Sequence, residues 1–312
     1  MNSKLIEVLE KTYDESLVFA EPVSGNSRNI SYMISFANGI KYIVKYISEG
    51  ARRKRMEKEI ALCKTIKEQD DDFPCSVPEP VCVFEEGFIY IQDFIEGKTL
   101  NQWPMDCLDE QALANGLLTL IERLRNIRIS PELMMTTGYE SKSWKEFLKK
   151  KLDAFNHKIQ RSCVLDMHLL EGIRRFTEDV IEKMDEPRFP FLIHNDLNGD
   201  NIIVHVTEQY PMLVSVIDFE RALFGDPLKD VSKLVWVFRK RKRLGDLFWK
   251  GCTEQFGYDE EDYRTLKGYF CFDILNHFSK YDQLLKRDRW QGYFEEERTI
   301  LQNMEKDTFV LW

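Results

Sequence analysis

Hydrophobic positions change their spacing near residue 97 of this chain. Up to about residue 95 they form short β-rich runs, and afterwards they recur mostly at helical spacing. The first part predicts strands at 17–23, 30–36, 40–47, 81–84 and 88–93 and one helix at 52–68. The second predicts helices at 108–127, 143–160, 166–184, 229–243, 260–285 and 293–306. We expect an α+β fold with a boundary at Gly97.

The segment 191–219 interrupts the helical part with a strand, a loop and a hairpin. Apolar Phe191-Leu192-Ile193 leads into the loop His194-Asn195-Asp196-Leu197-Asn198-Gly199-Asp200-Asn201. The next apolar runs, 202–204 and 213–217, are expected to pair as a hairpin. That pairing brings Asp218, at the end of the second run, next to Asn201.

These side chains have the chemistry that phosphoryl transfer from a nucleotide requires. Asp196 can accept or orient the proton of an incoming hydroxyl, and Asn201 and Asp218 can chelate Mg²⁺ that bridges the nucleotide phosphates. Asp and Asn are common in any loop, so each residue alone is weak evidence for a functional site. Asp-x4-Asn followed by a strand and Ile217-Asp218-Phe219 is far more specific. His194 is expected to brace the loop by hydrogen bonds.

The first part of the chain contributes a candidate phosphate-binding lysine. Lys45 shares a strand face with Ile43 and Ile47, which suggests a pocket. Its orienting carboxylate is expected to be Glu59, at the edge of the apolar stripe of the helix over 52–68. Glu57 lies further from that apolar stripe, so it is the less favoured partner for Lys45.

Two further segments are candidates for nucleotide contacts. The loop 24–29 contains Gly25 and Ser27 and could cover the phosphates with backbone N–H groups, although it is neither GxGxxG nor a Walker A motif. The backbone carbonyl and amide groups of the extended connector 91–97 could form hydrogen bonds with the edge of an adenine base.

The chain resembles the aminoglycoside phosphotransferase family, within the protein-kinase-like small-molecule kinases. The matching residues are Lys45, Glu59, His194-x-Asp196-x4-Asn201, Ile217-Asp218-Phe219-Glu220 and Gly225-Asp226-Pro227-x2-Asp230. One departure is Asn195, where such proteins usually carry glycine.

The resemblance implies a protein-kinase-like fold of two lobes. An antiparallel sheet with one helix would form the nucleotide-binding lobe, 1–96, with a hinge at about 92–97, and 97–312 would form a mainly helical catalytic and acceptor-binding lobe. It also implies ATP or GTP as donor, Mg²⁺ held by Asn201 and Asp218, and Asp196 as catalytic base. The Asp93 carbonyl and the Ile95 amide would meet the nucleobase. The expected acceptor is a hydroxyl of an aminoglycoside or similar hydroxylated antibiotic, so the predicted role is antibiotic resistance.

Composition narrows the partners and the compartment. The net charge is −9, which disfavours nucleic acid and anionic membranes and suits a cationic small molecule. Acidic runs at 259–262 and 295–297 would suit a polycationic acceptor, although helix-start charges and solvated faces explain them better. Seven scattered cysteines without a CxxC pair, and no long apolar run or apolar signal core, predict a cytoplasmic protein with reduced thiols.

Three other functions compete with this interpretation. A protein kinase is disfavoured because only six residues separate Asp218 from Gly225, which leaves no activation segment. A metabolite kinase of the same fold, with choline, homoserine or methylthioribose as acceptor, stays open. A non-catalytic nucleotide-binding regulator is disfavoured because it would need no base at Asp196.

Overall fold

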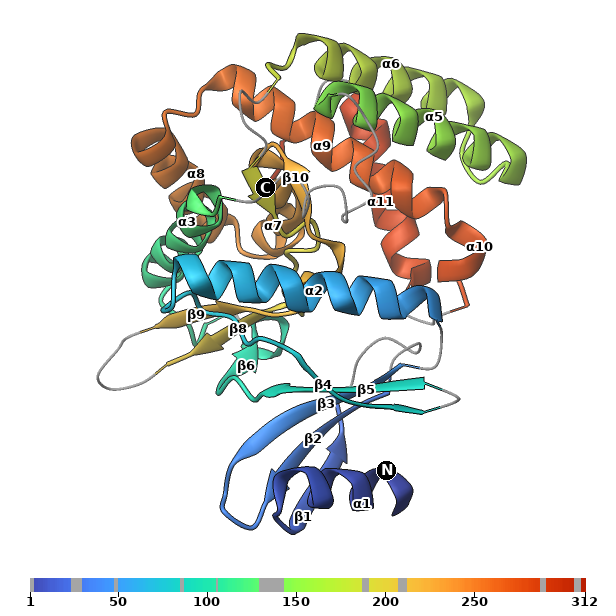
Figure 1. Ribbon diagram of the computed structural model, residues 1–312. Helices are drawn as coiled ribbons and strands as arrows, with labels where there is room; N and C mark the ends of the chain where they lie inside the picture. Colours follow the sequence, from blue (N-terminus) through green and yellow to red (C-terminus); the bar gives the residue numbers. More distant parts are fainter. Residues whose placement is uncertain are drawn as a thin grey trace.

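The structure is a computed structural model in which an antiparallel sheet and a larger helical part enclose a central helix (Figure 1). It describes residues 3–23, 30–47, 50–84, 87–104, 106–128, 143–186, 191–206, 212–286, 290–305 and 310–312. The expected α+β class is confirmed by this arrangement.

The N-terminal sheet has five antiparallel strands in the order β1-β2-β3-β5-β4. Their bounds are β1 Leu17–Pro22, β2 Ile30–Phe36, β3 Lys41–Ile47, β4 Glu79–Phe84 and β5 Gly87–Asp93. The expected hairpin joins β2 to β3, and Gly39 adopts a φ of 83°, which glycine tolerates best. The strand spacing in the sequence therefore predicted this sheet well.

A first helix, α1 Ser3–Tyr13, lies outside the elements expected from the sequence. It buries Leu5 and Leu9 against Ile34, Phe36 and other apolar side chains of the sheet. Its 11 residues are too few to be stable alone in water, so this packing holds it in place.

Helix α2, Gly50–Gln69, lies between the sheet and the helical part (Figure 1). Met56 packs with Ile47 and Tyr90 of the sheet, whereas Cys63 and Ile66 belong to the large C-terminal core. The helix therefore joins the two parts of the molecule through apolar contacts on both sides.

The larger part is mainly helical, as expected. Its helices are α3 Glu110–Asn126, α5 Trp144–Ser162, α6 Met167–Lys183, α7 Leu228–Lys240, α8 Lys242–Phe256, α9 Glu260–Phe278, α10 Tyr281–Leu284 and α11 Trp290–Glu305. The helix expected over 229–243 in fact ends at Lys240, because Arg241 leaves helical geometry with φ −139°. Helix α8 follows and was not expected.

Among the residues that the structure describes, two small sheets and two 3₁₀ turns complete the fold. Strands β7 Phe191–Ile193 and β10 Leu223–Gly225 pair antiparallel, and β8 Ile202–His205 pairs with β9 Leu213–Val216 as expected. The turns are η1 Leu100–Gln102 and η2 Phe219–Arg221.

The connection between the two parts follows β5. Strand β6, Lys98–Thr99, pairs with β8, so the chain has entered the second part by residue 98. The boundary at Gly97 and the hinge at 92–97 stay predictions about how the two parts act. Among the described residues, no helix is long and apolar enough to cross a membrane.

Gly225 permits close packing between β10 and α5. A Cβ built there would lie 2.6 Å from Trp144 Cζ3, and Trp144 is buried. We expect Gly225→Ala to lower the free energy of unfolding by about 1–3 kcal/mol through overpacking, measured by urea denaturation. Gly292→Ala in α11 is the control, because nothing lies within 4 Å of its Cβ position. Equal stability of the two variants would contradict the packing explanation.

Candidate active site

The loop that follows β7 is held by a buried carboxylate. Asp230 in α7 accepts the backbone N–H of His194 and of Asn195, both at 2.7 Å. Burial raises the pKa of Asp230, whereas the two backbone N–H donors oppose the rise. Asp230 therefore fixes the backbone from which Asp196 extends.

His194 braces this loop from inside. Its Nδ1 accepts the Asp196 N–H at 3.3 Å, and its Nε2 lies 3.0 Å from the Ile217 carbonyl. The two contacts together require a neutral ring with the proton on Nε2. His194 is fully buried, and its ring lies edge-on to the Phe219 ring with 4.7 Å between the centroids. The role of His194 is therefore to hold the loop in place.

Asn195 adopts a left-handed backbone with φ 60°. Glycine and asparagine are the residues that take this conformation most readily, which explains why asparagine is tolerated at this position. The Asn195 side chain also donates to the Arg221 carbonyl at 3.2 Å, so it connects the loop to the turn η2.

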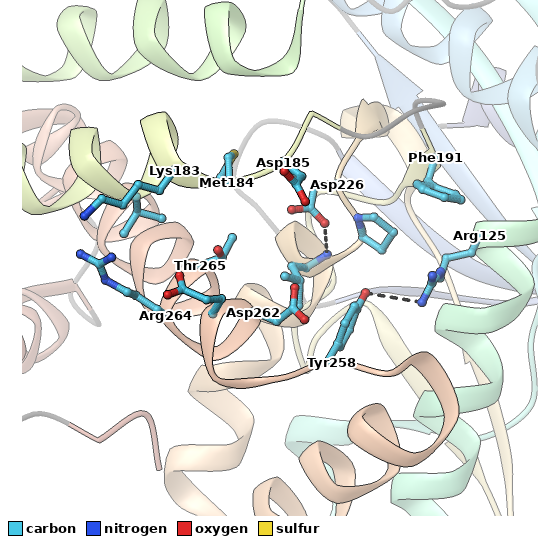
Figure 2. Close-up of a pocket in the computed structure, with 14 residues that line it drawn as sticks. Arg125, Lys183, Met184, Asp185, Phe191, Asp226, Tyr258, Asp262, Arg264 and Thr265 are labelled. Carbon is cyan, nitrogen blue, oxygen red and sulfur yellow. Dashed lines mark hydrogen bonds between the residues drawn. The ribbon is translucent and has the colours of Figure 1, made fainter.

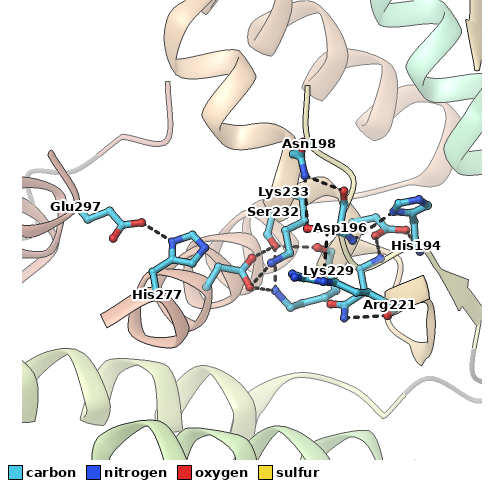
Figure 3. A network of polar contacts seen from close by, with 12 residues as sticks. His194, Asp196, Asn198, Arg221, Lys229, Ser232, Lys233, His277 and Glu297 are labelled. Atoms are coloured by element: carbon cyan, nitrogen blue, oxygen red, sulfur yellow. Dashed lines mark hydrogen bonds and ion pairs between the residues drawn. The ribbon is translucent and has the colours of Figure 1, made fainter. Parts of the chain in front are cut away.

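The Asp196 carboxylate is accessible, with 23% of its side chain exposed. It receives a long hydrogen bond from Asn198 Nδ2 at 3.4 Å and lies 3.6 Å from Arg221 Nε (Figure 3). Neither contact covers the carboxylate completely. Asp196 can therefore reach the hydroxyl of a small molecule.

Asn201 and Asp218 are adjacent, as the hairpin predicts. The Ile217 N–H donates to the Asn201 carbonyl at 3.0 Å, which places Asp218 beside Asn201. Asp218 itself adopts a left-handed backbone with φ 71°, and a third of its side chain is exposed.

This pair fits a hard cation whose remaining ligands come from elsewhere. Asn201 uses its NH₂ group to donate to the Asp196 carbonyl at 2.8 Å, so its side-chain oxygen is the atom left for a cation. Within the described ranges, no three His, Cys, Asp or Glu side chains form a metal cluster. One carboxylate and one amide oxygen suit Mg²⁺, which retains waters and binds substrate phosphates.

Lys45, Glu59 and Asp218 meet from three distant segments. Lys45 Nζ lies 3.8 Å from Glu59 Oε1 and also 3.8 Å from Asp218 Oδ1. Glu59 is buried and accepts the Phe219 N–H at 3.0 Å, whereas Glu57 is exposed and pairs with Arg53.

Burial and charge oppose each other in this group. Burial disfavours the Lys45 ammonium, but Glu59, Asp218 and Glu220 outweigh it and raise the pKa of Lys45. Burial also raises the pKa of Glu59, although Lys45 opposes the rise. The lysine is therefore held in its charged form, which suits contact with phosphates.

The remaining candidates for nucleotide contacts lie around the connector. Asp93 ends β5, and Ile95 follows in the connector to β6. In the sheet Asp93 lies opposite Tyr42 of β3, the strand that also carries Lys45. Gly25 and Ser27 lie outside the described residues.

The acidic run at 259–262 lies away from Asp196. Asp259 caps α9 by accepting the N–H groups of Glu261 and Asp262. Glu261 and Asp262 line a cavity of about 540 Å³ beside Phe191 and Asp226, at the opposite end of β7 from the catalytic loop (Figure 2). The helix-start explanation is confirmed for 259–262, whereas the solvated-face explanation is wrong for Glu297, which is buried and pairs with His277.

Asp226 belongs to the same distant region. It accepts the Leu228 N–H at 2.9 Å and the Tyr269 hydroxyl at 2.9 Å, and burial raises the pKa of its carboxyl to about 6. These contacts begin α7 and hold it against α9. They give Asp226 a structural role.

Sequence reasoning overlooked two residues beside Asp196, Asn198 and Arg221. Asn198 lies inside the quoted loop, and Arg221 directly follows the quoted Ile217–Glu220 motif. No motif signalled them, because their importance depends on the approach of η2 to the loop.

Comparison with known proteins identifies the family. A family model described as the phosphotransferase enzyme family matches residues 20–269. A search of curated proteins found no match. The chain belongs to the phosphotransferase enzyme family, and the resemblance stated from its motifs is confirmed.

Solved structures share the fold over almost the whole chain at low identity. The GDP and kanamycin complex of APH(2″)-IIIa has a TM-score of 0.73 and 19% identity, covering 99% of this chain and 100% of that chain. The spectinomycin phosphotransferase APH(9)-Ia, with ADP and spectinomycin, has a TM-score of 0.67 and 15% identity, covering 95% and 94%. Apo APH(4)-Ia, as a thermostable mutant, has a TM-score of 0.69 and 15% identity, covering 97% of each.

Loss of Asp230 should loosen the catalytic loop. We expect Asp230→Asn to lower the free energy of unfolding by about 1–3 kcal/mol, because one of two buried N–H donors then meets an NH₂ group. Urea denaturation measures the change. Asp153→Asn, on the exposed face of α5, is the control, with an expected change within about 0.5 kcal/mol. A loss no larger than that of the control would contradict the bracing role.

Proposed function

We propose that this protein transfers the γ-phosphate of ATP or GTP to a hydroxyl group of a small molecule. One observation carries the proposal: Lys45 lies 3.8 Å from both Glu59 and Asp218, while Asp196 extends partly exposed from the loop that also holds Asn201. Phosphoryl transfer depends mainly on positioning and charge neutralisation, which these groups supply.

In this proposal the N-terminal lobe, residues 1–96, binds the nucleotide. Lys45 contacts the α- and β-phosphates, and Glu59 orients its ammonium. The Asp93 carbonyl and the Ile95 amide meet the nucleobase in the hinge, and the backbone around Gly25 and Ser27 covers the phosphates. The charged state of Lys45 supports its role.

The second lobe, residues 97–312, supplies the catalytic groups. Asn201 and Asp218 would hold Mg²⁺, which neutralises charge on the phosphates when bound. Asp196 accepts or orients the proton of the acceptor hydroxyl. His194 and Asp230 hold the backbone of Asp196, so its carboxylate needs little reorganisation.

Two acceptor classes are candidates. Two of the structural neighbours named above were solved with kanamycin or spectinomycin, which favours an aminoglycoside or related hydroxylated antibiotic and a role in resistance. A metabolite carrying an alcohol, as in choline, homoserine or methylthioribose kinases, is the alternative. The cytoplasm, where nucleoside triphosphates are available, is the expected site of the reaction.

A coupled assay of ADP or GDP release tests the reaction. The purified chain is incubated with Mg²⁺, ATP or GTP, and a panel of aminoglycosides, other hydroxylated antibiotics and hydroxylated metabolites. We expect release that depends on Mg²⁺ and on one acceptor class. Absence of acceptor-dependent release across the panel, together with no binding of the Mg²⁺–nucleotide complex, would reject the proposal.

Variants of the two carboxylates should separate catalysis from metal binding. We expect Asp196→Ala to lower kcat on the order of 10²–10⁴-fold with nearly unchanged nucleotide Kd, because the hydroxyl loses its base. Asp218→Ala should raise the Kd of the Mg²⁺–nucleotide complex by about tenfold or more. Asp200→Ala, an exposed carboxylate in the same loop, is the control. Equal loss of nucleotide binding in the first two variants would contradict these roles.

A further inference from the structure

Helix α7, which carries Asp230, is tied to helix α9 through one buried carboxylate. Asp273 of α9 is 3% exposed and binds three side chains of α7, which converge in Figure 3. Its Oδ1 pairs with the Lys229 ammonium and, at 2.7 Å, with the Lys233 ammonium. Its Oδ2 lies 2.8 Å from the Ser232 hydroxyl oxygen. Both oxygens of the carboxylate are therefore engaged by the first turns of α7.

These three partners occupy one face of α7 and fix its rotation about the helix axis. Lys229, Ser232 and Lys233 stand at spacing i, i+3 and i+4, which places them on the same side of a helix. Asp230 directly follows Lys229, so its side chain points about 100° further round the axis. Because α9 holds the first face, Asp230 points in a fixed direction, toward the catalytic loop.

The contacts continue without a gap from Asp273 to the proposed catalytic base. Asp230 accepts the backbone N–H groups of His194 and Asn195, both at 2.7 Å. His194 in turn accepts the Asp196 N–H at 3.3 Å through its Nδ1. A displacement of α7 would therefore displace the backbone from which the Asp196 carboxylate extends.

Burial makes α7 dependent on this carboxylate. Lys229 is also 3% exposed, and its ammonium lies 5.6 Å from the ring centre of Tyr269 and 5.4 Å from that of Phe272, both in α9. Across the ranges that the structure describes, no carboxylate other than Asp273 lies within ion-pair distance of Lys229 or Lys233. Loss of Asp273 would leave a buried ammonium uncompensated, so the turn of α7 that carries it would shift toward water.

A buried ion pair between two helices can act in two ways. It can neutralise charge, in which case well-packed apolar side chains replace it without loss. It can also fix one relative position of the helices, because hydrogen bonds are directional, whereas apolar cores that are repacked lose rigidity before they lose stability. Ser232 is uncharged, so its contact with Asp273 contributes direction and no neutralisation. The second role therefore explains the whole set of contacts on Asp273.

We propose that Asp273 is a positioning residue for phosphoryl transfer, which holds the catalytic loop in its reactive geometry through α7 and Asp230. The inference rests on the proposed function and adds helix α9 to the elements on which its catalytic step depends. In this role Asp273 acts through other residues and contacts no reacting atom. It keeps Asp196 aligned, and a misplacement of about 1 Å at such a site costs on the order of 10²-fold in rate.

Two variants of the full-length protein separate positioning from charge neutralisation. Asp273→Asn keeps the size of the side chain and removes its charge. The double variant Asp273→Leu with Lys229→Met replaces the buried pair by apolar side chains. The Lys233 side chain is 15% exposed and can turn to solvent in both variants. Asp179→Asn is the control, because it breaks an ion pair that joins α9 to α6 instead of α7.

Amide hydrogen exchange followed by NMR reports on the loop without any catalysis. We expect the His194 and Asn195 amides to exchange about tenfold faster in Asp273→Asn and in the double variant, because Asp230 holds them less firmly. Their exchange should stay unchanged in Asp179→Asn. The Tm should fall in Asp273→Asn and recover in the double variant.

The double variant decides between the two roles. Exchange at His194 and Asn195 that returns to normal together with the Tm would show that Asp273 only neutralises Lys229, and would overturn the proposal. Fast exchange at a recovered Tm supports it, because stability and loop position are then separated. The double variant gives this answer alone where Asp273→Asn does not fold.

Kinetics with any acceptor that is turned over provide a second measurement. We expect kcat to fall about tenfold or more in Asp273→Asn and in the double variant, while the Kd of MgADP changes less than about twofold. A general loss of stability does not produce this split at temperatures below the Tm. Normal kcat in the double variant would overturn the inference. Lack of turnover and of Mg²⁺–nucleotide binding would reject the kinase function, whereas the exchange rates still show whether Asp273 holds the loop.

Discussion

The contacts of the buried Glu59 carboxylate are the constraint on which the candidate site depends. Its Oε1 lies 3.8 Å from the Lys45 ammonium and accepts the Phe219 N–H at 3.0 Å, so a strand of the first sheet, helix α2 and the turn η2 meet at one atom. An isolated buried carboxylate is unfavourable, and these partners are what allow it to be there. The relative placement of Lys45 and Asp218 follows from this arrangement.

The catalytic loop shows a second constraint, in which backbone strain is balanced by buried polar contacts. Asn195 has a left-handed backbone, and such positions persist only where the surroundings hold them. Asp230 binds the two N–H groups at the start of the loop, and the neutral His194 ring binds the next one. The same contacts orient Asp196, so stability of the loop and readiness for chemistry have one physical origin.

The local arrangement of charged groups in this protein says more about ligand preference than its net charge does. The net charge of −9 suggested a preference for cationic ligands, yet the acidic run at 259–262 serves the start of α9 beside a distant cavity. Around Asp196 the charges are mixed, because Arg221 of η2 lies 3.6 Å from its carboxylate and 3.9 Å from that of Glu220. Interactions between charges weaken over roughly 10 Å in physiological salt, so local groups decide what a site attracts.

The sequence by itself determined most of the strands and helices, the β8–β9 hairpin and the identity of Lys45, Glu59, Asp196, Asn201 and Asp218 as candidates. These features depend on local periodicity, turn chemistry and motif spacing, which neighbouring residues encode. Helices α1 and α8 and the position of Arg221 beside Asp196 were decided only by tertiary structure. They depend on packing and charge between residues far apart in the chain, such as Arg221 with Asp196, and no local pattern contains that information.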